Sequence, residues 1–272
     1  MFFLIFILIQ LGQNFCNGQL DFWKTHDFCH VIHQNGTHIQ IDLYGNLYLI
    51  GETSIQKFSK SNETENFILD KSLQLNRLGR ITQMDVSNPQ KILIFFNDFQ
   101  SLIFFDNDLN ELYQIDLSQL SDIECELICN SSENGLWVWR GDQKQLIFLN
   151  SNLNIERRSL KFPANLENAK AIYMLEKNNR IYVLFDNQQL FIFDLFANYI
   201  EQLEVLDIQK FSFFENDLAY FSKKNIILQK LDHATILPLD ENLQDAIDAQ
   251  VINDQIYIQY CDSIRICPFR KN

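Results

Sequence analysis

The chain has 272 residues, of which 47% are hydrophobic, and a net charge of -13 at pH 7. This length is sufficient for one large domain with a substantial core or for two domains of ordinary size. Binding to nucleic acid or anionic lipid depends on Lys and Arg that neutralise phosphate, and here 22 such residues face 35 Asp and Glu. The charge balance therefore argues against nucleic acid and anionic membrane surfaces as partners.

The first residues of the chain have the pattern of a secretory signal peptide. An apolar run, FFLIFILI at 2–9, is too short to span a bilayer as a helix. The small residues Cys16 and Gly18 then precede a suitable cleavage position before Gln19. We expect residues 1–18 to be a signal peptide and residues 19–272 to form one exported domain. The rest of the chain has no apolar run long enough for a transmembrane helix, so we expect it to be soluble after cleavage.

An odd number of cysteines remains after cleavage, which is unusual for an exported chain. At least one of them is therefore expected to be free or bonded to another molecule. Cys125 and Cys129 lie on one face of a predicted strand, about 13 Å apart at about 3.3 Å per residue, which is too far for a disulfide. We expect both to be buried as small apolar side chains. The remaining cysteines are Cys29, Cys261 and Cys267.

Short apolar runs recur along the whole exported part of the chain. Examples are NLYLIG (46–51), KILIFF (91–96) and GLWVWR (135–140), and successive copies are separated by 37 to 46 residues. Spacing of this length and regularity indicates a fold built from repeated supersecondary units. The central positions of the six copies are Tyr48, Ile94, Trp137, Tyr182, Ala219 and Tyr257.

Each copy contains four segments with the character of strands. In the second copy, between residues 80 and 117, these are RITQMDV, KILIFF, QSLIFF and ELYQIDL. The two central runs are apolar at successive positions, so both of their faces must be buried, whereas the last segment alternates. Radially stacked four-stranded sheets explain this pattern. The sequence predicts an all-β fold, a six-bladed β-propeller with four-stranded antiparallel blades; five or seven blades are the alternatives. The polar stretch 61–76 is interpreted as a linker between units.

The last copy, residues 248–269, has room for only three strands. We expect the segment FCHVIH at 28–33 to pair with this C-terminal sheet as the missing strand, which would fasten the ring and leave no open edge. This pairing would bring Cys29 close to Cys261 or Cys267. A disulfide to either of them would lock the ring.

The stretch IDLYGNLYLIGETSIQKFS (41–59) has an Asp, a Gly-Asn turn and a Tyr at Asp42, Gly45, Asn46 and Tyr48. It resembles the Asp-x-x-Gly-Asn-x-Tyr unit of exported NHL-type and PQQ-like propellers. The exported chain as a whole is similar to uncharacterised envelope propellers of Bacteroidetes-type bacteria. The resemblance implies a propeller in the periplasm or cell envelope. It implies no catalytic residue, because propellers of this appearance include binding scaffolds, lyases and lactonases.

Few residues have the pattern of a metal site or a catalytic site. His26, His30 and His33, with Cys29 nearby, are the densest group of potential ligands, but on a strand His33 points away from the other two. We therefore predict no metal site there. The segment DNDLNE (106–111) lacks the Gly and the final Glu of a calcium loop and is predicted to be a hairpin turn. The common signatures of hydrolases, nucleotide-binding loops and zinc proteases are absent from the sequence, so no catalytic or cofactor-binding residue and no cofactor is predicted.

Two further groups of residues lead to structural predictions. Asn-x-Ser/Thr sequences, the acceptor pattern for glycosylation, begin at Asn35, Asn62 and Asn130. Three matches are expected by chance in an Asn-rich chain and mean nothing in a bacterium; for a eukaryotic source we expect all three on surface turns. Trp137 and Trp139 are expected to fill the space between two blades, because large rings interdigitate well there.

The compartment, the repeat and the lack of a convergent acid, base and nucleophile lead to one main hypothesis. It is a non-catalytic extracytoplasmic scaffold that binds a protein partner in the cell envelope. The alternative is a metal-dependent hydrolase or lyase of the propeller type, with carboxylates that converge at the mouth of the central channel. Asp, Glu or His side chains from different blades reaching one point would favour the enzyme, and an apolar patch on a rim would favour the scaffold.

Overall fold

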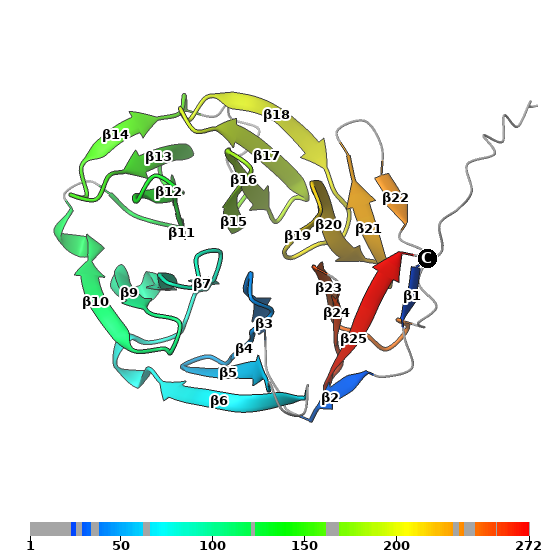
Figure 1. Ribbon diagram of the computed structural model, residues 1–272. Coiled ribbons are helices and arrows are strands. Elements are labelled where there is room, and N and C mark those ends of the chain that lie inside the picture. The colour runs from blue at the N-terminus through cyan, green and yellow to red at the C-terminus, as the bar shows by residue number, and fades with distance from the viewer. Residues whose placement is uncertain are drawn as a thin grey trace, which may run out of the picture.

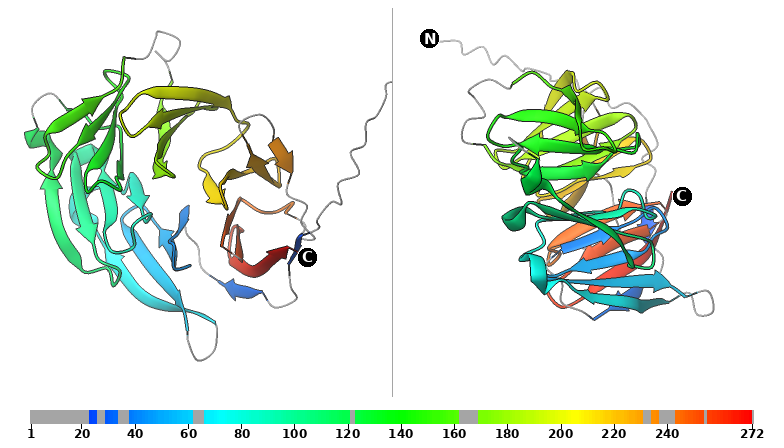
Figure 2. Two further views of the ribbon diagram at one scale, coloured as in Figure 1. Left: turned by 45° about the horizontal axis from the view of Figure 1, so that its top comes forward. Right: turned by 90° about the vertical axis from the view of Figure 1, so that its left-hand side faces the viewer.

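The chain folds into a six-bladed β-propeller. In the part of the chain that the computed structural model describes, the strands form six antiparallel sheets arranged as blades around a central axis (Figure 1). Figure 2 shows the same ring obliquely and from its edge. This confirms the fold predicted from the repeat, and the alternatives with five or seven blades are wrong. The described residues are 23–25, 29–33, 38–61, 66–120, 123–161, 169–230, 234–236, 243–253 and 255–271.

Each of the first five blades runs in chain order from an inner strand at the axis to an outer strand. Blade 1 contains β3 (His38–Ile41), β4 (Leu47–Ile50), β5 (Ser54–Lys60) and β6 (Phe67–Gln74), and blade 2 contains β7 (Gln83–Asp85), β8 (Ile92–Phe96), β9 (Ser101–Phe105) and β10 (Glu111–Asp116). Blade 3 contains β11 (Leu127–Asn130), β12 (Leu136–Arg140), β13 (Gln145–Leu149) and β14 (Ile155–Arg158). Blade 4 contains β15 (Ala171–Lys177), β16 (Arg180–Phe185), β17 (Gln189–Asp194) and β18 (Tyr199–Glu204), and blade 5 contains β19 (Ser212–Phe214), β20 (Asp217–Ser222), β21 (Asn225–Gln229) and β22 (Ala234–Ile236). Short 3-10 helices occur at η1 (Asn76–Leu78), η2 (Asn97–Phe99) and η3 (Leu117–Gln119).

Blade 6 combines strands from both ends of the chain. Its C-terminal strands are β23 (Asp248–Ile252), β24 (Gln255–Gln259) and β25 (Ile264–Lys271), and its N-terminal strands are β1 (Trp23–Thr25) and β2 (His30–Ile32). β2 pairs antiparallel with β25, with His30 opposite Ile266, which confirms the predicted closing strand. β1, which the sequence did not predict, pairs further along β25, with Trp23 opposite Lys271. The predicted signal peptide, residues 1–18, lies outside the described residues.

The core lies between the blades, and it explains the apolar runs. All residues of β8 and β9 are buried, whereas most of β10 is exposed, because neighbouring blades cover only the inner part of each sheet. Trp137 and Trp139 are fully buried in a cluster that blades 3 and 4 share, as predicted. Trp139 meets the ring of Phe185 edge-on, with centroids 5.2 Å apart.

The interpretation of residues 61–76 as a linker is wrong. Residues 67–74 form β6, the outer strand of blade 1, and β6 pairs along its length with β5. An outer strand has solvent on much of its surface, so its sequence is as polar as that of a connecting segment. The remaining blade-to-blade connection after β6 begins at Leu75 and includes η1.

One turn geometry occurs four times in the described residues, which confirms the hairpin turn predicted at 106–111, and only its first copy has the Gly-Asn sequence. In each copy the first residue accepts backbone N–H groups of the third and fifth residues on its side-chain Oδ1. The fourth residue has a positive φ, 81° at Gly45 but 54° at Leu109 and 64° at Ala197. The side-chain bonds therefore hold a left-handed backbone where the sequence has no glycine. The four turns are Asp42–Asn46, Asp106–Asn110, Asn150–Asn154 and Asp194–Asn198.

Lys57, on β5, links blade 1 to blade 2 by a hydrogen bond to the turn Asp106–Asn110. Its side chain is only 2% exposed, and Nζ donates to the Asn107 carbonyl at 2.6 Å and lies 3.3 Å from Asp70. We expect Lys57→Met to lower the free energy of unfolding by about 2 kcal/mol, because a partly buried carbonyl loses a charged donor while packing is retained. Lys71→Met, which removes a more exposed bond to Asn110 at 2.8 Å, should cost less than about 0.5 kcal/mol. Urea denaturation of both variants checks this, and equal effects would contradict it.

Candidate binding site at the central channel

The inner strands β3, β7, β11, β15, β19 and β23 surround the axis of the ring (Figure 1). Where these strands end, residues from all six blades line a cavity of about 970 Å³, which we call the large hollow. Where the strands begin there is a smaller cavity of about 580 Å³, the small hollow. Gln40, Met84 and Tyr173 line both cavities and therefore lie between them.

The large hollow is acidic. The acidic and basic side chains in its lining are four carboxylates and one lysine. The carboxylates come from blades 1, 2, 4 and 5, so no single motif contains them. They are Asp42, Asp85, Glu176 and Glu215, and the lysine is Lys177.

Asp42 stabilises the hairpin in which it lies by accepting hydrogen bonds from other residues of that hairpin. Its Oδ1 accepts the backbone N–H groups of Tyr44 and Asn46, each at 2.9 Å. Its Oδ2 accepts the Asn46 side-chain amide at 2.8 Å and the Tyr48 hydroxyl at 3.0 Å. Burial, and then the negative charge of Asp42, raise the pKa of Tyr48, so this hydroxyl stays a donor. The residues that resemble the NHL-type unit therefore stabilise a turn.

Glu176, at the end of β15, is bound by donors from blade 3. The hydroxyl of Ser131 donates to it at 2.7 Å, and Ser132 donates through both its hydroxyl and its backbone N–H. The indole N–H of Trp137 donates at 2.6 Å. These bonds occupy both carboxylate oxygens and fasten blade 4 to blade 3.

Asp85, at the end of β7, makes the corresponding contact from blade 2. It is 4% exposed, and its two oxygens accept the backbone N–H groups of Ser87 at 2.8 Å and of Asn130 at 2.7 Å. The pKa of Asp85 is raised, chiefly because burial penalises its charged form, while these hydrogen bonds oppose the shift. The charge of Glu176 raises this pKa further.

Asn130 donates its backbone N–H to Asp85 and lines the large hollow. The residue is 6% exposed, and its side-chain N–H donates to the Lys91 carbonyl at 3.0 Å. Its Oδ1 is a buried acceptor that has no hydrogen-bond partner among the described residues. The prediction that this glycosylation sequence lies on a surface turn is wrong, because Asn130 is the last residue of β11. The sequences at Asn35 and Asn62 lie outside the described residues.

Carboxylates from different blades thus meet at the end of β11. Asp85 of blade 2 and Glu176 of blade 4 both bond to residues 130–132 of blade 3. Sequence reasoning missed them because they occupy different copies of the repeat; their shared place at the end of an inner strand was the available signal. Within the described ranges, no group of three or more His, Cys, Asp or Glu could hold a metal ion.

The histidines near the N-terminus do not converge in the described region. His30, on β2, packs against the ring of Phe67 with centroids 6.1 Å apart. His33 follows β2 and is exposed, and His26 lies outside the described residues. Burial lowers the pKa of His38, which lines the small hollow.

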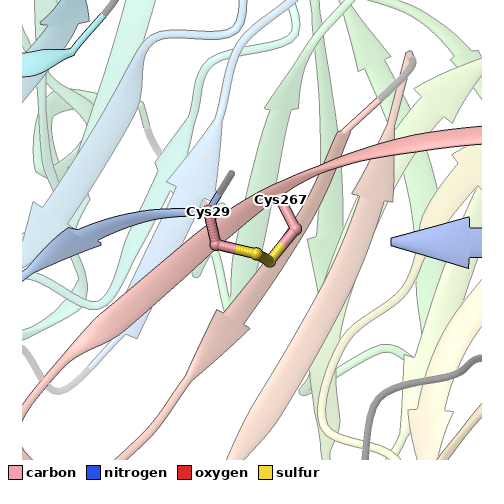
Figure 3. The surroundings of a disulfide bond; sticks show 2 residues. All are labelled: Cys29 and Cys267. Atoms are coloured by element: carbon pink, nitrogen blue, oxygen red, sulfur yellow. A yellow bond between two sulfur atoms is a disulfide. The ribbon is translucent and has the colours of Figure 1, made fainter. Parts of the chain in front are cut away.

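The cysteines divide into one disulfide and three free thiols among the described residues. Of the two partners that the sequence left open for Cys29, the structure pairs it with Cys267 (Figure 3), with Cα atoms 4.3 Å apart. Cys261 is exposed and free. Cys125 and Cys129 are buried, as expected, and burial raises the pKa of Cys125 to about 12.

The large hollow also has an apolar rim and an aromatic wall. Leu43 and Tyr44, in the first turn of blade 1, line it and are 54% and 65% exposed. Tyr173 and Phe211 line it from blades 4 and 5, with ring centroids 4.9 Å apart. Phe213, also in the lining, continues this wall.

The comparisons with known proteins agree with the fold. No known family description and no curated protein matches the sequence. BamB from Moraxella catarrhalis is similar in structure, with a TM-score of 0.51 and 11% identity over 86% of this chain and 83% of that chain. Virginiamycin B lyase from Staphylococcus aureus has a TM-score of 0.56 and 11% identity over 85% of this chain and 79% of that chain.

At this identity the likeness shows the fold alone. The chain is a six-bladed β-propeller, and its narrower resemblance to NHL-type and PQQ-like envelope propellers stays a prediction. In the described part of the chain, no helix is long and apolar enough to cross a membrane.

Proposed function

We propose that this chain is an extracytoplasmic scaffold that binds a protein partner through the face that bears the large hollow. The observation that carries the proposal is the combination of an open cavity of about 970 Å³ with the exposed apolar side chains of Leu43 and Tyr44 on its rim. Exposed apolar groups beside a concave surface are typical of interaction sites.

The state of the carboxylates supports binding over catalysis. A general acid or base must direct its proton or lone pair at a substrate. Asp42 and Glu176 instead accept hydrogen bonds from the protein on both oxygens, and the bonds to Glu176 join two blades. The alternative, a hydrolase or lyase at the channel mouth, would have to rest on Glu215 or on Asp85. The raised pKa of Asp85 suits a proton donor, but both of its oxygens also accept backbone N–H groups.

The location outside the cytoplasm rests on two observations. Residues 1–18 have the pattern of a signal peptide. Cys29 and Cys267 form a disulfide, and such bonds persist in oxidising compartments. We propose that residues 19–272 act in the periplasm or cell envelope, without a cofactor.

Affinity capture from the native envelope tests the scaffold. We expect the wild-type protein to recover a specific partner, identified by mass spectrometry, and the pair Leu43→Asp and Tyr44→Asp to reduce recovery at least about tenfold, as expected for charging the centre of an interface. The matched control is Ile68→Asp with Leu69→Asp on β6, where exposures of 53% and 50% are similar but far from the hollow. Equal recovery by both pairs, or no partner together with bound metal in the purified protein, would contradict the proposal.

A further inference from the structure

The negative charge in the large hollow exceeds the positive charge, because four carboxylates and one lysine, Lys177, line it. None of Asp42, Asp85 and Glu176 takes part in an ion pair among the described residues, whose ion pairs lie elsewhere. Neutral donors solvate Asp42 and Glu176 but leave their charge in place. Since charges interact more strongly in a partly desolvated cavity than in water, a cation that entered the hollow would be attracted.

A second, independent feature of the cavity calls for a hydrogen-bond donor. Asn130 is 94% buried, lines the hollow, and has an Oδ1 without a hydrogen-bond partner in the part of the chain that the structure describes. A buried acceptor left unpaired costs free energy, and a shift of the Asn130 side chain toward the cavity would let a ligand's donor recover it. Asn130 also lies next to Asp85, whose carboxylate accepts the backbone N–H group of Asn130.

The walls of the cavity suit a cation that carries an apolar stem. Tyr173, Phe211 and Phe213 supply aromatic surface, and Tyr44 stands exposed at the entrance. Aromatic faces attract ammonium and especially guanidinium groups, while the methylene stems of Lys and Arg pack on apolar surface.

From these observations we infer that the large hollow receives a basic side chain, an arginine or a lysine, that projects from the partner protein. The inference rests on the proposed scaffold function and names the chemistry that its partner presents. A protein-borne side chain is favoured over a free amine because Leu43 and Tyr44 offer exposed apolar surface at the rim of the hollow, where the chain flanking the basic residue would lie. The net charge of -13 would also attract a basic partner from a distance.

Binding of blocked peptides to the purified protein, measured by calorimetry, tests the inference. Acetyl-Gly-Arg-Gly-amide should bind at least about tenfold more tightly than the same peptide with citrulline, the neutral isostere of arginine, which corresponds to about 1.4 kcal/mol. The lysine peptide should bind between them. Agmatine, the free amine, should bind more weakly than the arginine peptide. Equal affinity for arginine and citrulline would overturn the inference, and tighter binding of agmatine would overturn the assignment to a protein side chain.

Variants localise the binding to the hollow. Asp85→Asn should weaken the arginine peptide about tenfold, and Tyr44→Ala should weaken it severalfold without disturbing the core, because Tyr44 is 65% exposed. Asp106→Asn is the control, because Asp106, like Asp85, accepts the backbone N–H group two residues further on but lies outside the hollow, and it should bind as the wild type does. Wild-type affinity in both Asp85→Asn and Tyr44→Ala would place the binding elsewhere.

The failure of this inference can be told apart from failure of the scaffold. If a captured partner is not released by excess arginine peptide, the scaffold stands and the basic side chain does not enter the hollow. If the arginine peptide binds with the expected selectivity but no partner is recovered, the hollow recognises the cation and the scaffold function is wrong.

Discussion

Replacing Cys29 with serine is expected to lower the free energy of unfolding by about 2–5 kcal/mol. The disulfide to Cys267 closes a loop with a sequence separation of 238 residues, so its loss frees much of the unfolded chain. It also releases β2, whose three residues pair only with β25 among the described strands. Urea denaturation of the oxidised proteins measures the effect.

The matched control for this prediction is Cys261→Ser, because Cys261 is exposed and free and its replacement should change stability by less than about 0.5 kcal/mol. Cys267→Ser should match Cys29→Ser, and the double variant should be no less stable than either single one, since all three lose the same bond. Additive losses, or a single variant as stable as the wild type, would show that the bond does not hold the ring.

Replacing Trp137 with alanine is expected to cost about 3–5 kcal/mol. Trp137 is 0% exposed, its ring lies 5.0 Å from that of Phe148, and its indole donates to Glu176 at 2.6 Å. The change therefore opens a cavity between blades 3 and 4 and removes a donor from a carboxylate. Trp137→Phe, which retains an aromatic ring but loses the indole N–H, should cost about half as much.

Thermal and urea unfolding of the two variants separate the packing from the hydrogen bond. Phe196→Ala serves as the control, because Phe196 is 72% exposed and its loss should cost less than about 0.5 kcal/mol. If Trp137→Phe were as stable as the wild type, the bond to Glu176 would contribute nothing. If Trp137→Ala cost no more than Phe196→Ala, the assignment of Trp137 to the core would be wrong.

The sequence was sufficient for the fold because the blades bury their inner strands on both faces. Runs such as ILIFF at 92–96 are stable only where neighbouring blades cover both faces of the strand. Because the runs recur at regular spacing, one in each unit, the number of copies gives the number of blades. The last copy lacked a strand, so the closing strand could be located as well. Where solvent covers a strand this signal disappears, which is why β6 was taken for a linker and β1 was not predicted.

The candidate site was less accessible to sequence reasoning. Asp85 and Glu176 lie in different copies of the repeat, and only the ring brings both to residues 130–132. The recurrent turn was hidden for a related reason. Side-chain oxygen atoms hold its left-handed residue, so Leu109 and Ala197 stand where the sequence motif has Gly45.

Blade 6, which contains strands from both ends of the chain, also determines how the protein responds to tension. Trp23 and Lys271 are opposite one another, so a force on the two ends would peel β1 from β25 one residue pair at a time, which requires little force. The peeling stops at Cys29 and Cys267, where the load passes directly through a covalent bond. All residues between these two cysteines, and with them the large hollow, are shielded from a pull on the termini.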